Sequence, residues 1–507
     1  MADAAVEREL GGFRSKFFLA FGSIGWGVKD AGITGLLLLF YNQVIGAPAY
    51  LVSFAIGTAL VVDAFADPII GILSDNWRSR LGRRHPFMYA SAVPVGVLYW
   101  LIWNPNHAWP NATLFVYLLV TAIGARIAIA TFEIPSTALL AELTTDYNRR
   151  TEFLSWRFLF GIVGAATISF YAFTFLFVPD ATHKFGQLNP AGYPKYALIA
   201  SIIMTASILI SCLGLHRYIP HFIVPEVRHR TARQFFSELW ETLSVKPFFV
   251  LLISGLFSGM AAGLSGGMGN YVLTFFWKLN SKEIALFSFV GIIAAILAFL
   301  VVVPITKRFE KKHAAMAAAL LGIVFGTGPY VLALFGWTPD YTAKWLLPFL
   351  LLLFTVIAAI GIAGGVLTGS MITDVVEYSA LQTGRRSEGT YFAALSLMNK
   401  SISGVGIFFS GLVLSLADFP VHADPATIDP AIMRHLFVVY LPVLAVLYAL
   451  AIYFFNTYRI TRAEHAENVK RLAEELALTR VGVAAEFAGA TLPPPADAAK
   501  VVPAPGP

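Results

Sequence analysis

Charged residues are scarce in this chain. They make up 13% of its 507 residues, where a soluble globular chain carries roughly 25%. Apolar residues account for 57% of the sequence, and the mean hydropathy is +0.70. A soluble fold of this composition would expose large apolar patches, so soluble enzymes and nucleic-acid-binding proteins are excluded. The composition predicts a membrane protein that contacts the lipid bilayer and no nucleic acid.

Cysteine is nearly absent as well. The single Cys212 lies in an apolar segment, so an intramolecular disulfide is ruled out. No His, Cys and Asp cluster has metal-ligand spacing, and no phosphate-binding glycine loop occurs. We therefore predict that the protein is not an enzyme and uses no cofactor, with Na⁺ as the one candidate metal.

What the chain does have is a series of twelve long apolar segments. A transmembrane helix needs about 20 apolar residues, and each segment is close to or above that length. The segments cover approximately residues 17–44, 50–74, 86–104, 112–142, 153–178, 195–216, 248–277, 284–304, 314–336, 345–373, 389–417 and 433–458. They predict an all-α polytopic protein of the cytoplasmic membrane, with twelve transmembrane helices.

The basic residues predict its orientation. Of the 36 Lys and Arg, 26 fall in the two tails and the even-numbered loops, six in the opposite loops and four within apolar segments. Because Lys and Arg concentrate on the cytoplasmic side of membrane proteins, both termini are predicted to be cytoplasmic. Most of the net charge of +6 therefore records topology and says little about partners.

A polar stretch divides the twelve segments into six and six. The predicted organisation is a cytoplasmic tail (1–16), a six-helix bundle (17–216), a cytoplasmic loop with an amphipathic helix (217–247), a second bundle (248–458) and a partly disordered cytoplasmic tail (459–507). A weak repeat, RRTE at 149–152 and RRSE at 385–388, supports two related halves. Such halves are typical of transporters in which one bundle rocks against the other around a central site.

Charges inside the apolar segments carry the functional information, since each costs about 2.5–3.5 kcal/mol at the centre of a bilayer. Asp63 and Asp67 are four residues apart and therefore share one face of a helix. Two neighbouring carboxylates repel unless a cation or proton lies between them, which favours a cation or proton site. The alternative is that each acid pairs separately with an Arg or Lys.

Glu133 is a third intramembrane acid. Pro135 follows it and removes a backbone donor, so a bend is expected there that frees a carbonyl oxygen to act as a ligand. The alternative is a structural ion pair with Arg126. That pair needs side-chain reach, because the two residues are two helical turns, or roughly 10 Å, apart.

The remaining intramembrane charges are candidates for binding a solute. Lys29 and Asp30 are adjacent and point about 100° apart, so at most one is expected to pair with any single neighbour. Lys400 lies deep in its segment, whereas Arg157 is close enough to an end to extend to the interface instead. Trp26 precedes Lys29 by one turn and either stacks on a ring or simply packs.

Two further clusters lie at predicted cytoplasmic ends of helices and are assigned to gating. The loop GILSDNWRSRLGRR places an acid at a helix end before several arginines, whereas topology alone asks only for Lys and Arg. TDVVEYS places two acids near the end of the tenth segment, where gating or a structural role is expected. The residues are Asp75, Arg78, Arg83, Arg84, Asp374 and Glu377.

Together these motifs resemble a known family. GILSDNWRSRLGRR is similar to the loop between helices 2 and 3 of the major facilitator superfamily. VKD, DAFADP, FEIP, ELTTDYNRRTEFLSWR, DVVEYS and LMNKS, in this order, resemble the glycoside-pentoside-hexuronide:cation symporters, the melibiose permease family. The resemblance covers residues 13–458 and implies the major facilitator fold, with a sugar and a coupling cation in a cavity between the halves.

The resemblance also implies roles for individual residues. Asp63 and Asp67 match the cation-site carboxylates, and Glu133 stands where an Asp serves both cation and sugar. The positions that match the family's sugar site are Lys29, Asp30, Arg157 and Lys400. Ala66 and Ala130 replace two neutral oxygen ligands, which weakens the case for Na⁺ relative to H⁺, and Thr131 is a candidate substitute for one of them.

Two tryptophans that pack on the sugar in melibiose permease align with Thr137 and Gly365, which implies a wider cavity and another substrate. The leading hypothesis is a secondary active transporter, functional as a monomer, that performs H⁺- or Na⁺-coupled symport of a sugar, glycoside or related small organic solute by alternating access. One alternative is an exporter or proton antiporter of amphipathic compounds, or a lysolipid-type carrier. Another is a membrane sensor that transports nothing.

Overall fold

The structure is a computed structural model. It describes residues 10, 12–144, 146–222, 234, 237, 240, 244–337, 340–383, 388–461, 463–465, 467, 468, 470 and 471, without the side chains at 147, 148, 380, 382, 383, 388–397, 399, 401 and 403. Every regular element within these residues is helical. Most of the predicted amphipathic helix in the central loop, and the second copy of the RR repeat, lie outside this part.

The helices form two groups that follow each other in the chain. The first consists of α2 (Phe13–Phe21), α3 (Ser23–Gly35), α4 (Leu37–Leu39), η1 (Phe40–Val44), α5 (Ala49–Asn76), α6 (His85–Ile102), α7 (Asn111–Ala138), α8 (Leu140–Leu143), α9 (Tyr147–Tyr171), η2 (Ala172–Leu176), η3 (Gly186–Leu188), α10 (Gly192–His216) and η4 (Ile219–His221). The second consists of α12 (Lys246–Tyr271), η5 (Val272–Phe276), α13 (Ser281–Leu286), η6 (Phe287–Phe289), α14 (Val290–Arg308), α15 (Lys311–Leu334), α16 (Leu346–Thr383), α17 (Glu388–Leu416) and α18 (Pro430–Thr457).

Most of these helices are built to cross a membrane. Within the described residues, ten are long and apolar enough, and the pair Phe13–Gly35 and Leu37–Val44, bent by 43°, makes an eleventh. Helix α17 has 29 residues, and its end Gly404–Leu416 is apolar. Helices are the form such segments must take, since lipid offers no partner for a free backbone N–H or C=O.

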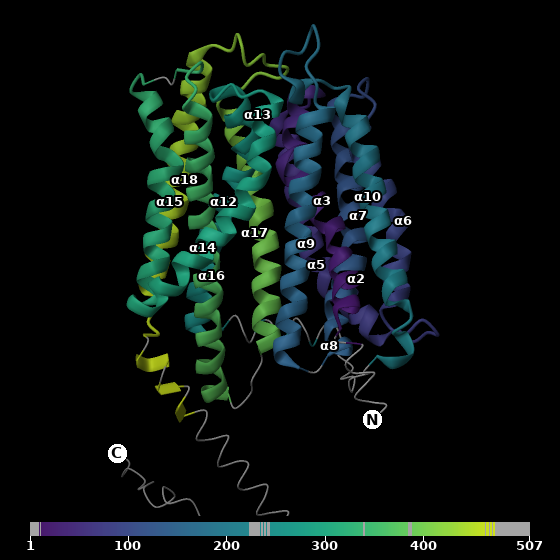
Figure 1. Cartoon of the computed structure of the whole chain (residues 1–507). Coiled ribbons are helices and arrows are strands. Elements are labelled where there is room, and N and C mark those ends of the chain that lie inside the picture. The colour runs from purple at the N-terminus through teal and green to yellow at the C-terminus, as the bar shows by residue number, and fades with distance from the viewer. Residues whose placement is uncertain are drawn as a thin grey trace, which may run out of the picture.

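The two groups stand side by side in Figure 1, and the axes of their long helices are roughly parallel. We call the end at which α5 and α18 begin the upper end, and the end at which they finish the lower end. Helix α5 packs along α17 of the other group, and α12 packs against α3 and α4. These pairs of helices form the boundary at which the candidate site lies.

The boundary is tightly closed toward the upper end. Gly57 of α5 and Gly404 of α17 let the two backbones touch, because a Cβ atom on Gly57 would lie 2.7 Å from the Gly404 carbonyl oxygen. The Tyr271 hydroxyl donates to Asn42 Oδ1 at 2.8 Å, again between the groups. At the lower end, the ion pairs that the structure describes each stay within one group. The groups are therefore joined through their upper halves.

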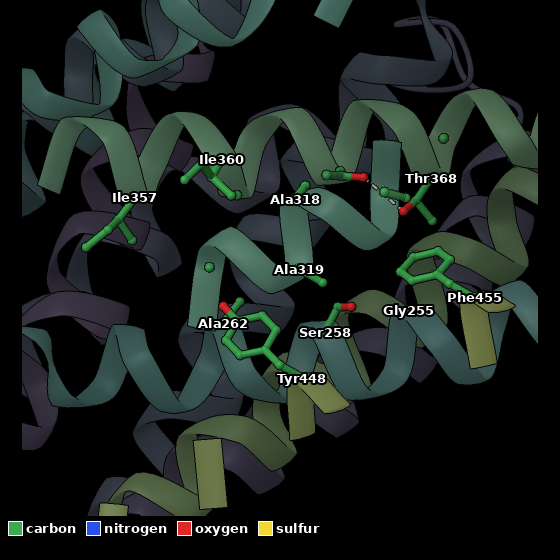
Figure 2. Close-up of a pocket in the computed structure, with 17 residues that line it drawn as sticks. Gly255, Ser258, Ala262, Ala318, Ala319, Ile357, Ile360, Thr368, Tyr448 and Phe455 are labelled. Carbon is green, nitrogen blue, oxygen red and sulfur yellow. Dashed lines mark hydrogen bonds between the residues drawn. The ribbon is translucent and has the colours of Figure 1, made fainter. Parts of the chain in front are cut away.

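Helices α12 and α16 of the second group approach each other only loosely, while both pack on their other neighbours. Between them lies a cavity of about 260 Å³, with α15 and α18 completing its wall. Figure 2 shows Ser258 of α12 and Thr368 of α16 on opposite sides of this space, with Ala318 and Ala319 of α15 between them. Small residues on α12, α15 and α16 leave the space open, while α18 contributes Tyr448 and Phe455.

Candidate functional site

An ion-pair cluster joins the two groups at the middle of α5. Lys400 of α17 places its Nζ 2.5 Å from Asp67 Oδ2 and 3.3 Å from Asp63 Oδ2. Arg126 of α7 places Nη1 3.3 Å from the same Asp63 oxygen. One ammonium contacts both acids, which agrees with their predicted position on one helix face. Two carboxylates and two cations meet here, so the formal charges balance.

The cluster is sealed at one end and accessible at the other. The Asp63 and Arg126 side chains are each 2% exposed, whereas Asp67 is 13% and Lys400 25% exposed. Among the described residues, Asp63 Oδ1 and Asp67 Oδ1 are buried and have no hydrogen-bond partner. Each acid thus uses one oxygen on the protein's own cations and keeps the other oxygen free.

For Asp63 and Asp67 the sequence left two possibilities open, a cation or proton site and pairing with basic side chains. In this structure both acids pair with basic side chains, and Lys400 contacts both of them. Arg126 pairs with Asp63 across helices and not with Glu133 along its own helix. Sequence reasoning missed this partner choice, although Arg126 was visible as one of the four basic residues inside apolar segments. A role for Asp63 and Asp67 in holding a coupling cation stays a prediction.

Helix α7 carries the other predicted cation ligands. It continues through Pro135 as far as Ala138, so the predicted bend beside Glu133 does not interrupt the helix. Hydroxyl groups supply hydrogen bonds locally, since Ser136 Oγ and Thr137 Oγ1 donate to the Glu133 carbonyl at 3.0 and 2.7 Å. The Thr131 hydroxyl likewise donates back to its own helix, which leaves its lone pairs available to a ligand.

Arg157 of α9 reaches α7. Its guanidinium donates to Ser136 Oγ at 3.0 Å and to Thr137 Oγ1 at 2.8 Å, which places it across the same turn as Glu133. This contact is directed into the helix group, so the alternative in which Arg157 extends to the membrane interface does not describe this structure. The predicted contact of Arg157 with a solute stays a prediction.

Lys29 and Asp30 lie at the middle of α3. Lys29 Nζ is 3.0 Å from Asp30 Oδ1, so the neighbouring residues pair with each other. The long lysine stem spans the angle of about 100° between adjacent positions. Lys29 is 5% exposed and Asp30 39%, so the carboxylate is the accessible partner. Trp26 lies against Phe158 of α9, with ring centroids 6.1 Å apart, in a packing position.

At the lower end of the first group, arginines converge on one buried acid. Arg83 Nη2 lies 2.5 Å and Arg84 Nε 3.1 Å from Glu142 Oε1, and Arg84 also pairs with Asp75 at 3.1 Å. The pKa of the Arg84 guanidinium lies below its usual value because of burial, and the nearby carboxylates of Glu142 and Asp75 offset part of this shift. Arg78 is not part of the cluster, because it donates to the Asp75 and Trp77 carbonyls.

Sequence reasoning missed Glu142. It lies in α8, at the end of the fourth apolar segment, where an acid looks like an ordinary interfacial residue. The signal was the high density of arginine in the facing loop, which needs a buried counter-charge once the loop folds against the helices.

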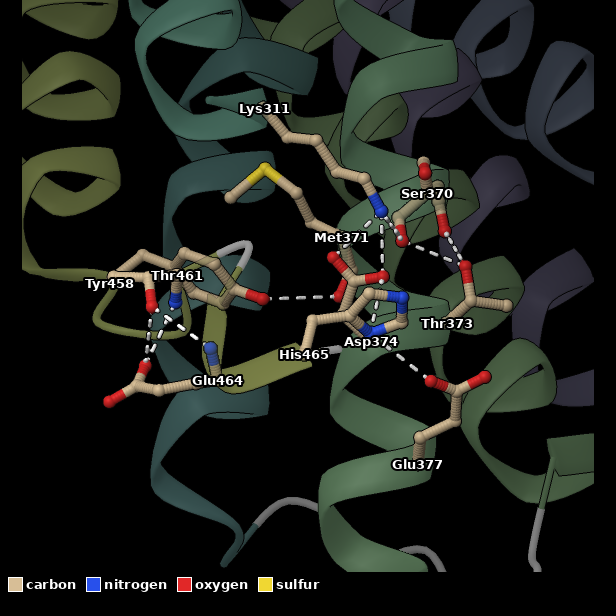
Figure 3. Close-up of polar contacts among 11 residues, drawn as sticks. Lys311, Ser370, Met371, Thr373, Asp374, Glu377, Tyr458, Thr461, Glu464 and His465 are labelled. Carbon is tan, nitrogen blue, oxygen red and sulfur yellow. Dashed lines mark hydrogen bonds and ion pairs between the residues drawn. The ribbon is translucent and has the colours of Figure 1, made fainter. Parts of the chain in front are cut away.

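A comparable cluster lies at the lower end of the second group. Lys311, at the start of α15, places Nζ 2.7 Å from Asp374 Oδ1 of α16. His465, beyond the end of α18, approaches Asp374 at 3.5 Å and Glu377 at 3.1 Å. Figure 3 shows both acids on α16, with Lys311 and His465 reaching them from separate elements. Neither partner of the two predicted gating acids was anticipated.

The fold is that of membrane transporters. One similar solved structure is the nucleoside transporter NupG, at a TM-score of 0.59, 15% identity and coverage of 89% of this chain and 100% of that one. Another is the inward-open xylose transporter XylE from E. coli, at a TM-score of 0.58, 15% identity and coverage of 90% and 98%. At such identities the likeness describes the fold alone.

The chain belongs to the MFS/sugar transport protein family, whose model matches residues 18–462. Among curated relatives, an uncharacterized symporter of Synechocystis sp. is 27% identical over 90% of this chain and 95% of its own length. The isoprimeverose transporter of Lactiplantibacillus pentosus is 26% identical, with 88% and 89% covered. A putative sulfoquinovose importer of Salmonella typhimurium is 24% identical, with 89% and 92% covered.

These comparisons confirm the family resemblance of the sequence motifs. The protein is a multi-pass membrane transporter of the major facilitator superfamily, in a family of symporters and sugar carriers, and not an enzyme.

Proposed function

We propose that the protein is a secondary active symporter that couples H⁺ or Na⁺ to the uptake of a sugar or glycoside by alternating access. The observation that carries this proposal is the cluster of Asp63, Asp67, Arg126 and Lys400, in which a basic residue of one group holds two acids of the other. Lys400 of the second group is held by the negative charges of Asp63 and Asp67 in the first. A cation bound at these acids would weaken that contact, so cation binding is linked to the relative position of the two groups. The names of the isoprimeverose and sulfoquinovose relatives support a sugar as solute.

The coupling step follows from charge balance. The cluster is neutral with Lys400 in place, so an added cation must displace the lysine, neutralise an acid as a proton, or leave a net positive charge in a low-dielectric site. The free Oδ1 atoms of Asp63 and Asp67 are available to such a cation, with Thr131 and Glu133 on α7 as further oxygen donors. The coupling is reciprocal: whatever factor the cation adds to solute affinity, the solute adds to cation affinity.

The solute is assigned to charged side chains of α3, α7, α9 and α17. Glu133 and the exposed Asp30 carboxylate accept hydrogen bonds from hydroxyl groups, while Arg157 and Lys400 donate them. Lys29 pairs with Asp30, and Trp26 of α3, which packs against Phe158, is the further side chain assigned to the solute. The lower clusters are proposed to hold each group rigid at its lower end and to exchange partners as the gate closes. The predicted gating residues that belong to them are Asp75, Arg83, Arg84, Asp374 and Glu377.

The architecture proposed for this function is twelve transmembrane helices in two bundles, 17–216 and 248–458, with the tails 1–16 and 459–507 and the loop 217–247 in the cytoplasm and a single chain as the working unit. Two observations support it. Helix α17 supplies a helical segment beyond the ten or eleven apolar spans of the described residues. Also, Arg83–Glu142 and Lys311–Asp374 repeat one pattern, a basic residue by the third helix of a half paired with an acid on the fourth.

Uptake into proteoliposomes tests the proposed function. We expect radiolabelled isoprimeverose, sulfoquinovose or xylose to accumulate above equilibrium when an inward Na⁺ or H⁺ gradient is imposed, and to equilibrate without accumulation when the gradient is collapsed. Accumulation that requires an outward cation gradient would instead indicate a proton antiporter or exporter. Binding of a sugar without flux in either direction would indicate a sensor.

Gly57→Leu is expected to prevent closure of the upper end. A side chain at this position collides with the Gly404 carbonyl, so the population shifts toward the state in which the upper ends separate. Ser53 is fully buried beside Phe408 and reports this opening as Ser53→Cys. Labelling by a membrane-impermeant maleimide from the upper side should be at least tenfold faster when Gly57→Leu is also present. Cys212 is buried and contributes little background.

The control is Gly326→Leu on α15, where an added Cβ meets no atom within 4 Å. It should leave the labelling rate of Ser53→Cys within about twofold. Equal labelling of all three proteins would contradict alternating access through this boundary.

A further inference from the structure

Two buried glutamines of the first group are bonded to the second group. Gln43, in η1, is 3% exposed, and Gln187, in η3, is 0% exposed. A glutamine amide both donates and accepts hydrogen bonds, and burying it costs free energy unless both needs are met. Each of these amides meets both needs on partners in the second group, so both side chains bridge the boundary at the upper end.

Gln43 holds the loop 417–429 between α17 and α18. Its Nε2 donates to the Pro420 carbonyl at 3.0 Å, and its Oε1 accepts from the Ala423 backbone N–H at 3.0 Å. His422, in the same loop, has a φ of 53° and places its Nδ1 3.0 Å from the Gln43 carbonyl oxygen. The loop is therefore folded around one residue of the other group.

Gln187 holds the corner between η5 and α13. Its Nε2 donates to Thr274 Oγ1 at 3.2 Å and to the Leu279 carbonyl at 3.0 Å. The Ser281 hydroxyl, at the start of α13, donates to Gln187 Oε1 at 2.7 Å. From within the first group, the Tyr193 hydroxyl donates to the Gln187 carbonyl at 2.6 Å. This glutamine is thus anchored on its own side and bonded three times on the other.

The two contacts repeat one pattern. η1 and η5 are π-helical and end the first membrane-spanning segment of each group. In both, one backbone N–H donates to the carbonyl five residues earlier and a second donates six residues earlier, namely Ile45 and Ala47 after η1, and Trp277 and Leu279 after η5. The loop before the last long helix of each group contacts this end of the other group. Packing within either group does not require this recurrence, so it indicates a shared role at the boundary.

We propose that Gln43 and Gln187 are paired latches of the upper gate, and that both must release before a solute enters from the upper side. This inference rests on the proposed function, because alternating access requires the upper ends to separate. Separation moves each loop away from the helix end that it contacts, so both amides lose their partners in the same step. Water replaces those partners in the opened gap, which allows the bonds to break without leaving polar groups unpaired.

Labelling of Ser53→Cys from the upper side tests the latches in the full-length protein in proteoliposomes. Gln43→Met and Gln187→Met keep the approximate size of the side chain and remove the amide. Each should raise the rate of labelling by a membrane-impermeant maleimide at least fivefold, and the double variant by about the product of the two effects. Asn104→Ala is the control, since its amide bonds to the Trp100 carbonyl of its own group, and should stay within about twofold.

A double-mutant cycle distinguishes a latch from a general loss of stability. Ser281→Ala removes only the donor to Gln187 Oε1 and should speed labelling at least twofold. In the Gln187→Met background it should cause no further increase, because the bond is already absent. Full addition of the two effects would overturn the latch at Gln187. Ser281→Ala also decides the case if Gln187→Met does not fold, and Gln43→Asn, with a shorter amide side chain, does so for the other latch.

Gly57→Leu separates this inference from the proposed function. If Gly57→Leu speeds labelling but the glutamine variants do not, the upper side opens without breaking these bonds, and the latches are wrong while alternating access stands. If only one glutamine variant speeds labelling, the pairing of the two latches is wrong. If no variant changes the rate, alternating access through this boundary fails together with the latches.

Discussion

Arg126→Leu is expected to lower the free energy of unfolding by about 3–5 kcal/mol, since it leaves a buried carboxylate without its partner. Asp63 and Arg126 are each 2% exposed, so water cannot replace the lost guanidinium. Lys400 cannot compensate fully, because its ammonium also serves Asp67. Equilibrium unfolding of the purified protein in mixed SDS micelles measures the change.

Two controls identify the cause. Arg434→Leu, at an exposed position, should change the free energy of unfolding by no more than about 0.5 kcal/mol. The double variant Asp63→Leu/Arg126→Leu removes both charges and should recover most of the loss, because apolar replacements of a whole buried pair are often neutral. A double variant as unstable as Arg126→Leu alone would show that the arginine stabilises the fold through contacts other than Asp63.

The membrane class, the helical spans and the positions of interest could be predicted from sequence. The reason is the cost of polar groups in lipid: a segment without water must be apolar and helical, and a charge within it must have a purpose. That argument located Asp63, Asp67, Glu133 and Lys400 without any knowledge of the fold. The i,i+4 spacing also placed the first two on one face, where a single ammonium now contacts both.

Partner choice could not be predicted in the same way. Whether Arg126 meets Asp63 or Glu133 depends on how α5 and α7 are rotated about their axes, which packing between helices decides and the sequence of one helix does not. The same applies to Glu142 and Lys311, each of which pairs with a residue on another element. The contact between Lys29 and Asp30 was not predicted either, because it depends on the length of the lysine side chain and not on the direction of the Cα–Cβ bonds.

Basic residues at the lower end of the first group have two different roles. Arg78 is exposed, and within the described residues its hydrogen bonds go to the nearby Asp75 and Trp77 carbonyls, as expected of a residue that serves topology. Arg83 and Arg84, in the same loop, instead fold against a buried acid. Basic residues of this loop therefore differ in what they contact, and burial distinguishes Arg83 and Arg84, which join helices, from the exposed Arg78, which fits the predicted topological role.

Asp67→Asn is expected to abolish gradient-driven accumulation of the solute. With Asp67 neutral, the cluster of Asp63, Arg126 and Lys400 carries a net positive charge before any cation arrives. Removing one negative charge about 4 Å from a bound cation costs roughly 4 kcal/mol at an effective dielectric constant of 20, or about a thousandfold in cation affinity. Asp340→Asn, in an exposed loop, is the matched control and should accumulate solute normally.

Lys400→Gln should act in the opposite direction on the same site. Loss of the ammonium leaves both carboxylates with Arg126 alone, so the site becomes negative and binds the coupling cation more tightly. Accumulation should fall here too, because a tightly held cation is released slowly. The cation dependence of thermal stabilisation distinguishes the two variants. The cation concentration that gives half of the full stabilisation should rise at least a hundredfold in Asp67→Asn and fall at least tenfold in Lys400→Gln. A midpoint that rises in both variants would mean that Lys400 helps to hold the cation and does not compete with it.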